Sequence, residues 1–143
     1  MKLTRKTLLN CTKKVEFDYP RKLEKLGEEL LLFMKSNGGV GLAANQVGLR
    51  DRVFVMHSFN FGDMVFFNPE IVEEFGGTVA DKEGCLSFPG LQIPVWRSRE
   101  VKLKWQDHKG EEHVRDFSGF ESRCIQHEVD HLMGLTFHFR MMQ

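Results

Sequence analysis

The stretch Gln126-His127-Glu128-Val129-Asp130-His131 is the most informative part of this sequence of 143 residues. Residues four apart share one face of a helix, so His127 and His131 can direct both imidazole rings at one metal ion. Glu128 follows His127 directly, and its carboxylate can reach a water molecule at that ion without binding the ion itself. Two core histidines with a surface acid between them would produce the same letters. The glutamate in the second position favours the metal site over that structural interpretation.

The residues around this stretch predict where its helix begins and ends. Ser118-Gly119-Phe120-Glu121 has the pattern of a capping box, in which the serine and glutamate side chains bind the first free backbone N–H groups. Gly134 is a suitable stop, because glycine readily adopts the left-handed conformation that ends many helices. We therefore expect both histidines on a helix that begins near Ser118 and stops at Gly134.

A catalytic site of this kind needs a third protein ligand and an open position for water. Thermolysin-like enzymes take a glutamate from further along the chain, but no Asp or Glu follows His131. Metzincins place a third histidine where this sequence has Phe137, and His138 comes one residue late. The third ligand is therefore expected before the helix.

Several residues before the helix could complete such a site. The candidates are Cys11, Cys85, Cys124, His57, His108, His113 and the acidic residues. Cys124 lies seven residues from His131, about 10 Å along a helix, so we interpret it as a small buried residue that lines the site. Cys85 stands between short apolar segments beside a glycine, but composition alone does not select it. The three other histidines are interpreted as structural or solvated.

Three segments taken together resemble the peptide deformylase family. They are Gly39-Val40-Gly41-Leu42-Ala43-Ala44-Asn45-Gln46, Glu83-Gly84-Cys85-Leu86-Ser87 and the histidine stretch at 126–131, which match the family motifs G-φ-G-φ-A-A-x-Q, E-G-C-φ-S and Q-H-E-φ-D-H. One of these motifs alone is a modest signal, whereas all three in order in a short chain are highly specific. The resemblance covers roughly residues 15 to 137. It implies a hydrolase that removes the N-formyl group from the initiator methionine of new polypeptides and releases formate.

The resemblance implies a metal site formed by Cys85, His127 and His131, with one divalent ion per chain. In this family Fe²⁺ is the usual ion, and Zn²⁺, Ni²⁺ or Co²⁺ can replace it. The residue types alone do not choose among these ions. Because a thiolate on Fe²⁺ can be oxidised, we expect the iron form to lose activity in air.

The resemblance also assigns chemistry to residues near the metal. Glu128 would act as general base and later return the proton to the leaving amine. The Leu86 backbone N–H and the Gln46 side-chain amide would bind the oxygen that becomes negatively charged.

The same resemblance implies a binding site for the formylmethionyl peptide. The Gly41 backbone would hydrogen-bond the substrate, and Arg97 would lie near the substrate backbone, although a surface cation is an alternative for Arg97. Asp130 would support a ligand or the helix, or be a surface acid. The walls of the methionine pocket are expected to be Val40, Phe120, the stem of Arg123 and Cys124.

Composition excludes several classes of function. Lys and Arg together number 20, as do Asp and Glu, so no basic surplus suggests direct nucleic-acid binding. Three cysteines suit a reducing cytosol better than a disulfide framework. We see no secretory signal and no stretch long enough to span a membrane. We expect a monomer in the cytoplasm of a bacterial type of cell. A bacterial-type host infected by a virus is included in this expectation.

The remaining pattern predicts an α+β fold in a single domain over residues 1–143. Asp18-Tyr19-Pro20 opens a helix with apolar residues at helical spacing, and Gly38-Gly39 ends it. Residues 52–57 and 64–67 predict a hairpin, with a break at Asn68-Pro69 and a resumption at 71–75. Residues 101–105 and 112–117 predict a second hairpin. We expect antiparallel sheets packed around the central metal-binding helix.

The sequence ends twelve residues after His131, whereas typical bacterial deformylases continue into a further helix that helps dock on the ribosome. The sequence resembles the shortened viral forms, and only weak ribosome association is expected.

Two other functions stay open. A metallopeptidase lacks its expected third ligand here, and a non-catalytic metal module would need Cys124 as a fourth ligand and would leave Glu128 without a use.

Overall fold

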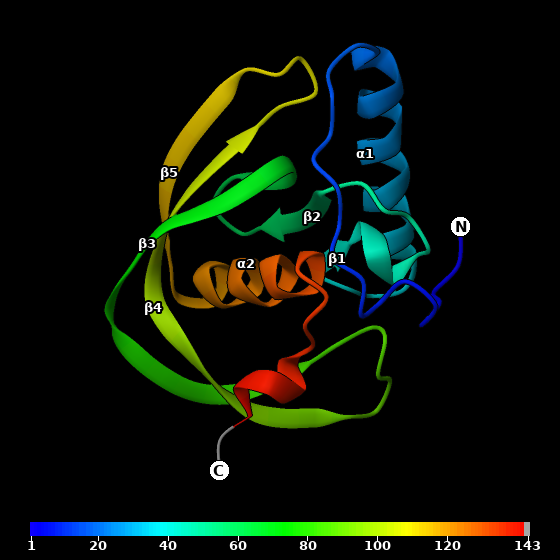
Figure 1. The fold of residues 1–143 in the computed structure, drawn as a ribbon. Helices are drawn as coiled ribbons and strands as arrows, with labels where there is room; N and C mark the ends of the chain where they lie inside the picture. Colours follow the sequence, from blue (N-terminus) through cyan, green and yellow to red (C-terminus); the bar gives the residue numbers. More distant parts are fainter. Residues whose placement is uncertain (142–143) are drawn as a thin grey trace.

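The computed structural model describes residues 1–141 and contains two α-helices, five strands and two short 3₁₀ helices (Figure 1). In chain order these are α1 (Pro20–Ser36), β1 (Gly41–Ala43), η1 (Ala44–Gln46), β2 (Val53–Ser58), β3 (Gly62–Gly84), β4 (Gln92–Gln106), β5 (Glu112–Ser118), α2 (Gly119–Leu132) and η2 (Phe137–Arg140). The predicted α+β fold is confirmed, with the histidine stretch on α2.

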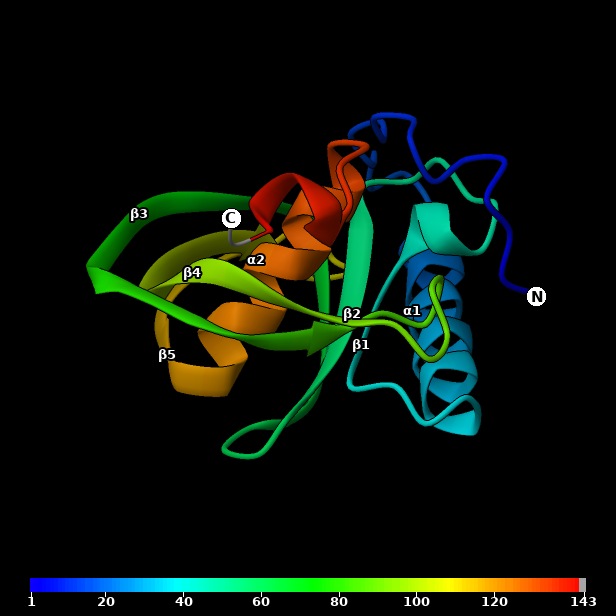
Figure 2. The same cartoon turned by 90° about the horizontal axis from the view of Figure 1, so that it is seen from below.

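The five strands form one sheet in the order β1-β2-β3-β4-β5, and every neighbouring pair is antiparallel. Strands β3 and β4 are long and bend around α2, so that the helix lies inside the curve of the sheet (Figures 1 and 2). Three register shifts between β3 and β4 accompany this bend, because an extra residue in one strand increases the local twist. The break expected at Asn68-Pro69 is the first of these shifts, within one continuous strand.

The main core lies between the sheet and α2. On β4, Val101 and Leu103 are fully buried and Trp105 is nearly so, whereas the intervening lysines are partly exposed. This alternation confirms the predicted strand with one wet face. The buried side chains pack against Ile125 and Val129 on α2 in one apolar cluster.

Helix α1 covers the other side of β1 and β2. Leu30 and Met34 are fully buried and belong to a second apolar cluster, which includes Leu42 and Val53. The helix begins at Pro20, as the sequence suggested, but Tyr19 occupies the cap position and makes no side-chain capping bond.

The two ends of α2 gave one correct and one wrong prediction. Gly134 has φ +80°, and its N–H donates to the carbonyl of His131, which confirms the stop. The capping box is wrong, because Ser118 makes no side-chain capping bond. The Glu121 carboxylate instead accepts a hydrogen bond from the Ser58 hydroxyl at 2.7 Å, on the β2–β3 hairpin.

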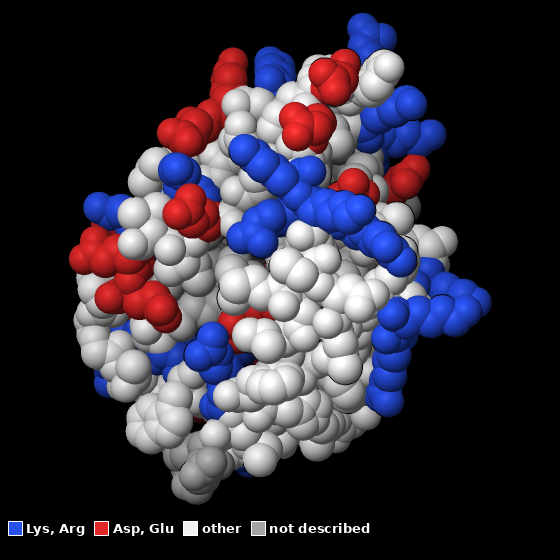
Figure 3. Space-filling view, viewed as in Figure 1, with Lys and Arg blue, Asp and Glu red and all other residues white. Residues whose placement is uncertain are grey.

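Charged side chains are unevenly spread on the face shown in Figure 3. Lys and Arg side chains form a band across this face, next to a broad area without charge. Among the described residues, no helix has the length and apolar character required to cross a membrane.

Candidate metal centre

Cys85, His127 and His131 bring three metal-ligating atoms together. The Cys85 Sγ lies 3.3 Å from the His131 Nε2, and the two histidine Nε2 atoms lie 3.1 Å apart. Each residue contributes one ligand atom, and all three atoms lie within 4.8 Å of one another. Helix α2 supplies both imidazoles at i and i+4, while Cys85 follows the end of β3. One thiolate and two imidazoles suit a borderline divalent cation such as Zn²⁺ or Fe²⁺.

Glu83 fixes the orientation of His127. The His127 Nδ1 lies 2.8 Å from the Glu83 Oε1, so this nitrogen donates to the carboxylate and the Nε2 faces Cys85 and His131. Burial would raise the pKa of Glu83, but hydrogen bonds from His127 and Arg97 outweigh burial and lower it to about 2. Burial likewise opposes a proton on His127, but its hydrogen bonds to Cys85 and Glu83 raise the pKa to about 10. Surroundings that favour a proton on this ring also favour a metal cation there.

His131 is held through its backbone. Its carbonyl accepts a hydrogen bond from the Asn45 side-chain amide, which also donates to the carbonyl of Asn10 at 3.3 Å. The His131 side chain is fully buried, and its Nδ1 has no hydrogen-bond partner among the described residues. Burial, together with the neighbouring His127, keeps the pKa of His131 well below its usual value. A neutral imidazole is the form that binds a metal.

Glu128 lies beside this centre without belonging to its ligand group. Its side chain is buried, and its Oε1 has no hydrogen-bond partner within the described part of the chain. Burial raises the pKa of Glu128 to about 7. A carboxyl group that titrates near neutral pH is suited to accept and return a proton.

Gln46 directs a hydrogen-bond donor toward the same centre. Its Oε1 accepts from the Ala43 N–H at 2.9 Å, which orients the amide so that its Nε2 donates to the Ser87 hydroxyl at 3.0 Å. The same Nε2 lies 3.6 Å from the Cys85 Sγ. The amide donor therefore lies where a substrate oxygen near the metal ligands would be within reach.

These residues surround a cavity of about 880 Å³. The expected pocket residues Val40, Gly41, Phe120, Arg123 and Cys124 all line it, together with Gln46, Cys85, Leu86, His127 and Glu128. Position 41 has no room for a side chain, because a Cβ on Gly41 would lie 2.5 Å from the Glu128 Oε2 and 2.7 Å from the Cys124 Sγ. Cys124 is buried and lies outside the group of three ligands, so a closed site with four protein ligands gains no support.

Arg97 was expected near the substrate backbone or at the surface, and Asp130 as a support for a ligand or the helix or at the surface; both are buried. Arg97 is only 3% exposed, and its guanidinium binds Glu83 at 2.9 and 3.0 Å and Asp130 at 2.6 Å. Arg97 is therefore neither a surface cation nor part of the cavity lining. Asp130 is also buried, so it is no surface acid, and it holds the arginine that in turn holds Glu83. Arg123 donates a further hydrogen bond to the Glu83 carboxylate at 2.7 Å.

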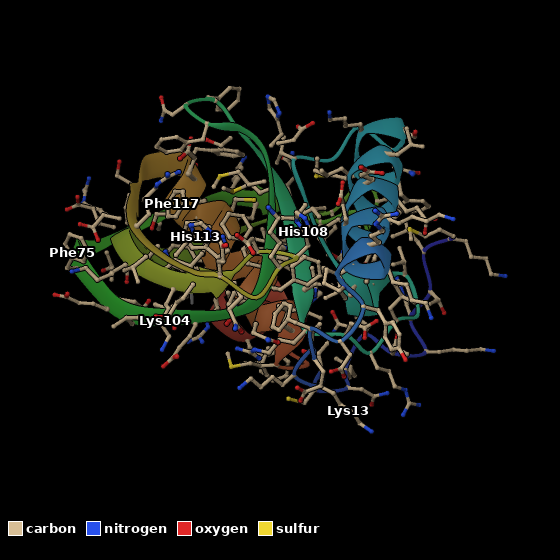
Figure 4. All side chains as sticks on the ribbon, turned by 90° about the horizontal axis from the view of Figure 1, so that it is seen from above. Lys13, Phe75, Lys104, His108, His113 and Phe117 are labelled. Carbon is tan, nitrogen blue, oxygen red and sulfur yellow. The ribbon has the colours of Figure 1, made fainter. Side chains whose placement is uncertain are left out.

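The other histidines lie away from the metal centre. His108 and His113 lie on the β4–β5 hairpin (Figure 4), where each is paired with a carboxylate, Glu24 and Asp107 respectively. His57 is exposed and paired with Asp63. Their interpretation as structural or solvated residues is consistent with these positions.

The whole chain, residues 1–143, matches the family model described as polypeptide deformylase. The chain belongs to this family. Peptide deformylase 1 of Clostridium perfringens is 46% identical over 121 residues, which cover 84% of this chain and 82% of that protein. The peptide deformylase of Prochlorococcus marinus (strain NATL1A) is 42% identical over 120 residues, but these cover only 59% of its length.

Solved structures of peptide deformylases have the same fold. The enzyme of Plasmodium falciparum aligns with a TM-score of 0.92 and 32% identity, covering 99% of this chain and 87% of the other. The enzyme of Thermotoga maritima aligns with a TM-score of 0.91 and 38% identity, covering 97% and 93%. The resemblance seen in the three sequence motifs is thereby confirmed at the level of the family and the fold.

Proposed function

We propose that this chain is a metal-dependent amide hydrolase that removes the N-formyl group from the N-terminal methionine of new polypeptides and releases formate. The observation that carries the proposal is the convergence, beside one cavity, of three ligand atoms and a buried carboxylate whose Oε1 has no hydrogen-bond partner among the described residues. Cys85, His127 and His131 supply the ligand atoms, and Glu128 supplies the carboxylate beside them. Membership of the polypeptide deformylase family supports the same activity.

Cys85, His127 and His131 would hold one divalent cation. Such a cation acts as a Lewis acid on a carbonyl oxygen and lowers the pKa of water. We propose Fe²⁺ as the natural ion, with Zn²⁺, Ni²⁺ or Co²⁺ able to replace it. The Cys85 thiolate is the ligand that argues for this soft-to-borderline set over Mg²⁺ or Ca²⁺.

Glu128 would move the proton during hydrolysis. Its carboxylate takes a proton from the attacking water as the water oxygen bonds to the formyl carbon. The C–N bond then breaks, and the proton passes from Glu128 to the leaving amine nitrogen, so that formate and a free amino terminus remain. The pKa of about 7 places Glu128 in the range where both transfers are efficient at neutral pH.

Gln46 and Leu86 would stabilise the oxygen that gains negative charge. The Gln46 Nε2 is already oriented by Ala43 and lies close to Cys85, and Leu86 follows Cys85 at the edge of the cavity. A donor that is fixed before the reaction stabilises the developing charge without the cost of reorganising. The Gly41 backbone would bind the substrate chain beside them.

The methionine side chain would occupy the part of the cavity next to α2. Phe120, Cys124 and the stem of Arg123 line this part on the helix, and Val40 lines it on the opposite side. The guanidinium of Arg123 is bound to Glu83, which neutralises its charge, and to the carbonyls of Val79 and Val95. The stem of Arg123 can therefore contact an apolar side chain without presenting a charge to it.

The remaining expectations about partners stay predictions. They are a monomeric state, a cytoplasmic location and only weak association with ribosomes. The substrate class, N-formylmethionyl peptides, is the partner that the family and the cavity support together.

The proposal is tested by formate release from formyl-Met-Ala-Ser by anaerobically prepared protein whose metal content is measured. The parent is expected to contain one metal ion per chain and to release formate. Glu128→Ala is expected to keep the metal and to lose roughly 10²–10⁴-fold in turnover, the range for a general base. Glu111→Ala, on the exposed β4–β5 turn, is the control that keeps parental turnover. A metal-loaded parent that releases no formate would overturn the proposal.

A further inference from the structure

Two exposed aromatic rings pack against each other, and one of them lines the cavity. Phe120 is 49% exposed and lines the cavity, and Phe59, at the tip of the β2–β3 hairpin, is 75% exposed. Their ring centroids are 6.0 Å apart. We propose that this pair, called the aromatic shelf, presents Phe59 to the side chain of the third residue of the substrate and gives preference to large apolar residues there. The inference rests on the deformylase activity proposed above.

The hairpin tip is fixed in place beside α2. Glu121, only 5% exposed, accepts hydrogen bonds from the Ser58 hydroxyl at 2.7 Å and from the Asn60 side-chain amide at 3.2 Å. The Ser58 hydroxyl in turn accepts the backbone N–H groups of Asn60 at 3.1 Å and Phe61 at 2.9 Å. A buried acid that serves this loop, in place of capping its own helix, holds Phe59 against Phe120. The shelf is therefore preformed, and binding to it costs little conformational entropy.

The N-terminal end of α2 lies at the shelf, and the metal-ligating histidines lie further along the helix. Glu128, Cys124 and Phe120 are spaced four residues apart, so they follow one another along a single face of α2. Glu128 and Cys124 lie against Gly41, whereas Phe120 lies in the first turn of α2. A substrate whose formyl group lies near the metal and whose methionine lies beside Cys124 therefore extends past Phe120.

The strand register indicates the same direction. Gly41 pairs with Met56, and the Val40 carbonyl accepts the N–H of His57 at 2.9 Å. Because the two segments are antiparallel, the direction from Gly41 to Val40 is the same as the direction from Met56 to Ser58 and Phe59. Figure 2 shows the tip of this hairpin on the same side of the molecule as the first turn of α2. A peptide that leaves the metal alongside Val40 reaches the hairpin tip.

The spacing of the two rings selects the third residue of the substrate. In an extended peptide, side chains alternate in direction, and residues two apart point the same way about 6.6–6.8 Å from each other. The rings of Phe120 and Phe59 are 6.0 Å apart. A methionine in the pocket that Cys124 and Phe120 line therefore places the third side chain over Phe59, while the second side chain points away. The cavity, at about 880 Å³, has room for more than one side chain.

The test compares kcat/KM for formyl-Met-Ala-X peptides with Ala, Ser, Leu or Phe at X. The parent is expected to prefer Leu and Phe over Ala by roughly 3- to 10-fold, the range that contacts to aromatic rings provide. Phe59→Ala is expected to reduce this ratio to below about twofold, mainly through KM, because the shelf is remote from the reacting atoms. Formyl-Met-Leu-Ala, with the apolar residue moved to the second position, is expected to show no such gain.

Phe61→Ala is the matched control on the same hairpin. Phe61 is 50% exposed, but its ring packs against Phe117 and under the Arg115 guanidinium, and it does not line the cavity. This variant is expected to keep the parental preference. Equal kcat/KM for all four peptides in the parent, or a preference that survives Phe59→Ala, would overturn the inference. Failure of the proposed function would differ, since no peptide in the series would then release formate.

Discussion

Replacing Gly41 with alanine tests how tightly Glu128 is confined. The Gly41 backbone lies in a region that any residue adopts, so the substitution adds no backbone strain. Its only direct effect is the new Cβ, which would lie 2.5 Å from the Glu128 Oε2 and 2.7 Å from the Cys124 Sγ. Both side chains are buried on α2, so the new Cβ must displace them toward the cavity that they line.

The size of the effect follows from these distances. The Cβ lies about 0.9 Å short of the 3.4 Å at which ordinary contact with the carboxylate begins, and a displacement near 1 Å at a reacting group costs about 10²-fold in rate. The overlap with two buried side chains should also lower the free energy of unfolding by about 1–3 kcal/mol. We therefore expect Gly41→Ala to fold, to bind metal and to lose about 10²-fold in kcat/KM.

Formate release and urea unfolding, measured on the same preparations, separate the two effects. Gly84→Ala is the control, because a Cβ at Gly84 meets its nearest atoms at 3.9 Å, an ordinary contact. In the double variant Gly41→Ala/Cys124→Ala the contact with sulfur is removed, so stability should recover partly while turnover stays low. Parental turnover in Gly41→Ala would show that the Glu128 carboxylate is not confined as the distances indicate.

Three further predictions concern the metal, its support and the core. Glu83→Gln should weaken metal binding roughly 10- to 100-fold, as loss of a group that orients a metal-binding histidine typically does, and competition with a chelating dye measures this. It should also cost about 3 kcal/mol in urea unfolding, the lower end for breaking a buried ion pair, because glutamine keeps one acceptor. Chelation should abolish formate release and leave the far-ultraviolet circular dichroism nearly unchanged, because Glu83 and Asn45 hold both histidines through protein bonds; global unfolding on chelation would contradict this. Phe66→Ala should cost roughly 3–5 kcal/mol at an unchanged urea m-value, because this fully buried ring stacks on Phe54 at 4.5 Å; a loss below 1 kcal/mol would contradict the packing.

The metal helix was predictable because its information is local. His127 and His131 are four residues apart, and this spacing alone places both rings on one face. Gly134 was likewise read correctly, because a left-handed glycine ends a helix through bonds to its own last turn. Cys85 lies 42 residues before His127, and only the resemblance to a family selected it. The bend of β3 and β4 around α2 is what brings the cysteine to the histidines, and composition does not encode it.

The capping box failed for the opposite reason, since a distant contact took over a local signal. Ser118 and Glu121 have the right types and spacing, but the Glu121 carboxylate is engaged by Ser58 and Asn60 from another hairpin. Asn45 was equally invisible as a support for His131, because nothing local distinguishes it from any other turn residue. Both residues act through pairs more than 60 positions apart, which periodicity cannot detect.

The charges around Glu83 explain why two arginines are buried beside a metal centre. Arg97 and Arg123 both donate to this one carboxylate, and Asp130 balances Arg97. A buried ion pair contributes little net stability compared with apolar residues of the same volume, because desolvation offsets much of the attraction. The main effect of the two arginines is therefore to orient Glu83 and not to stabilise the fold. They bind both Glu83 oxygens and keep one of them directed at the His127 Nδ1. Through this contact the ring keeps its Nε2 directed at Cys85 and His131, in the orientation that a metal ion requires.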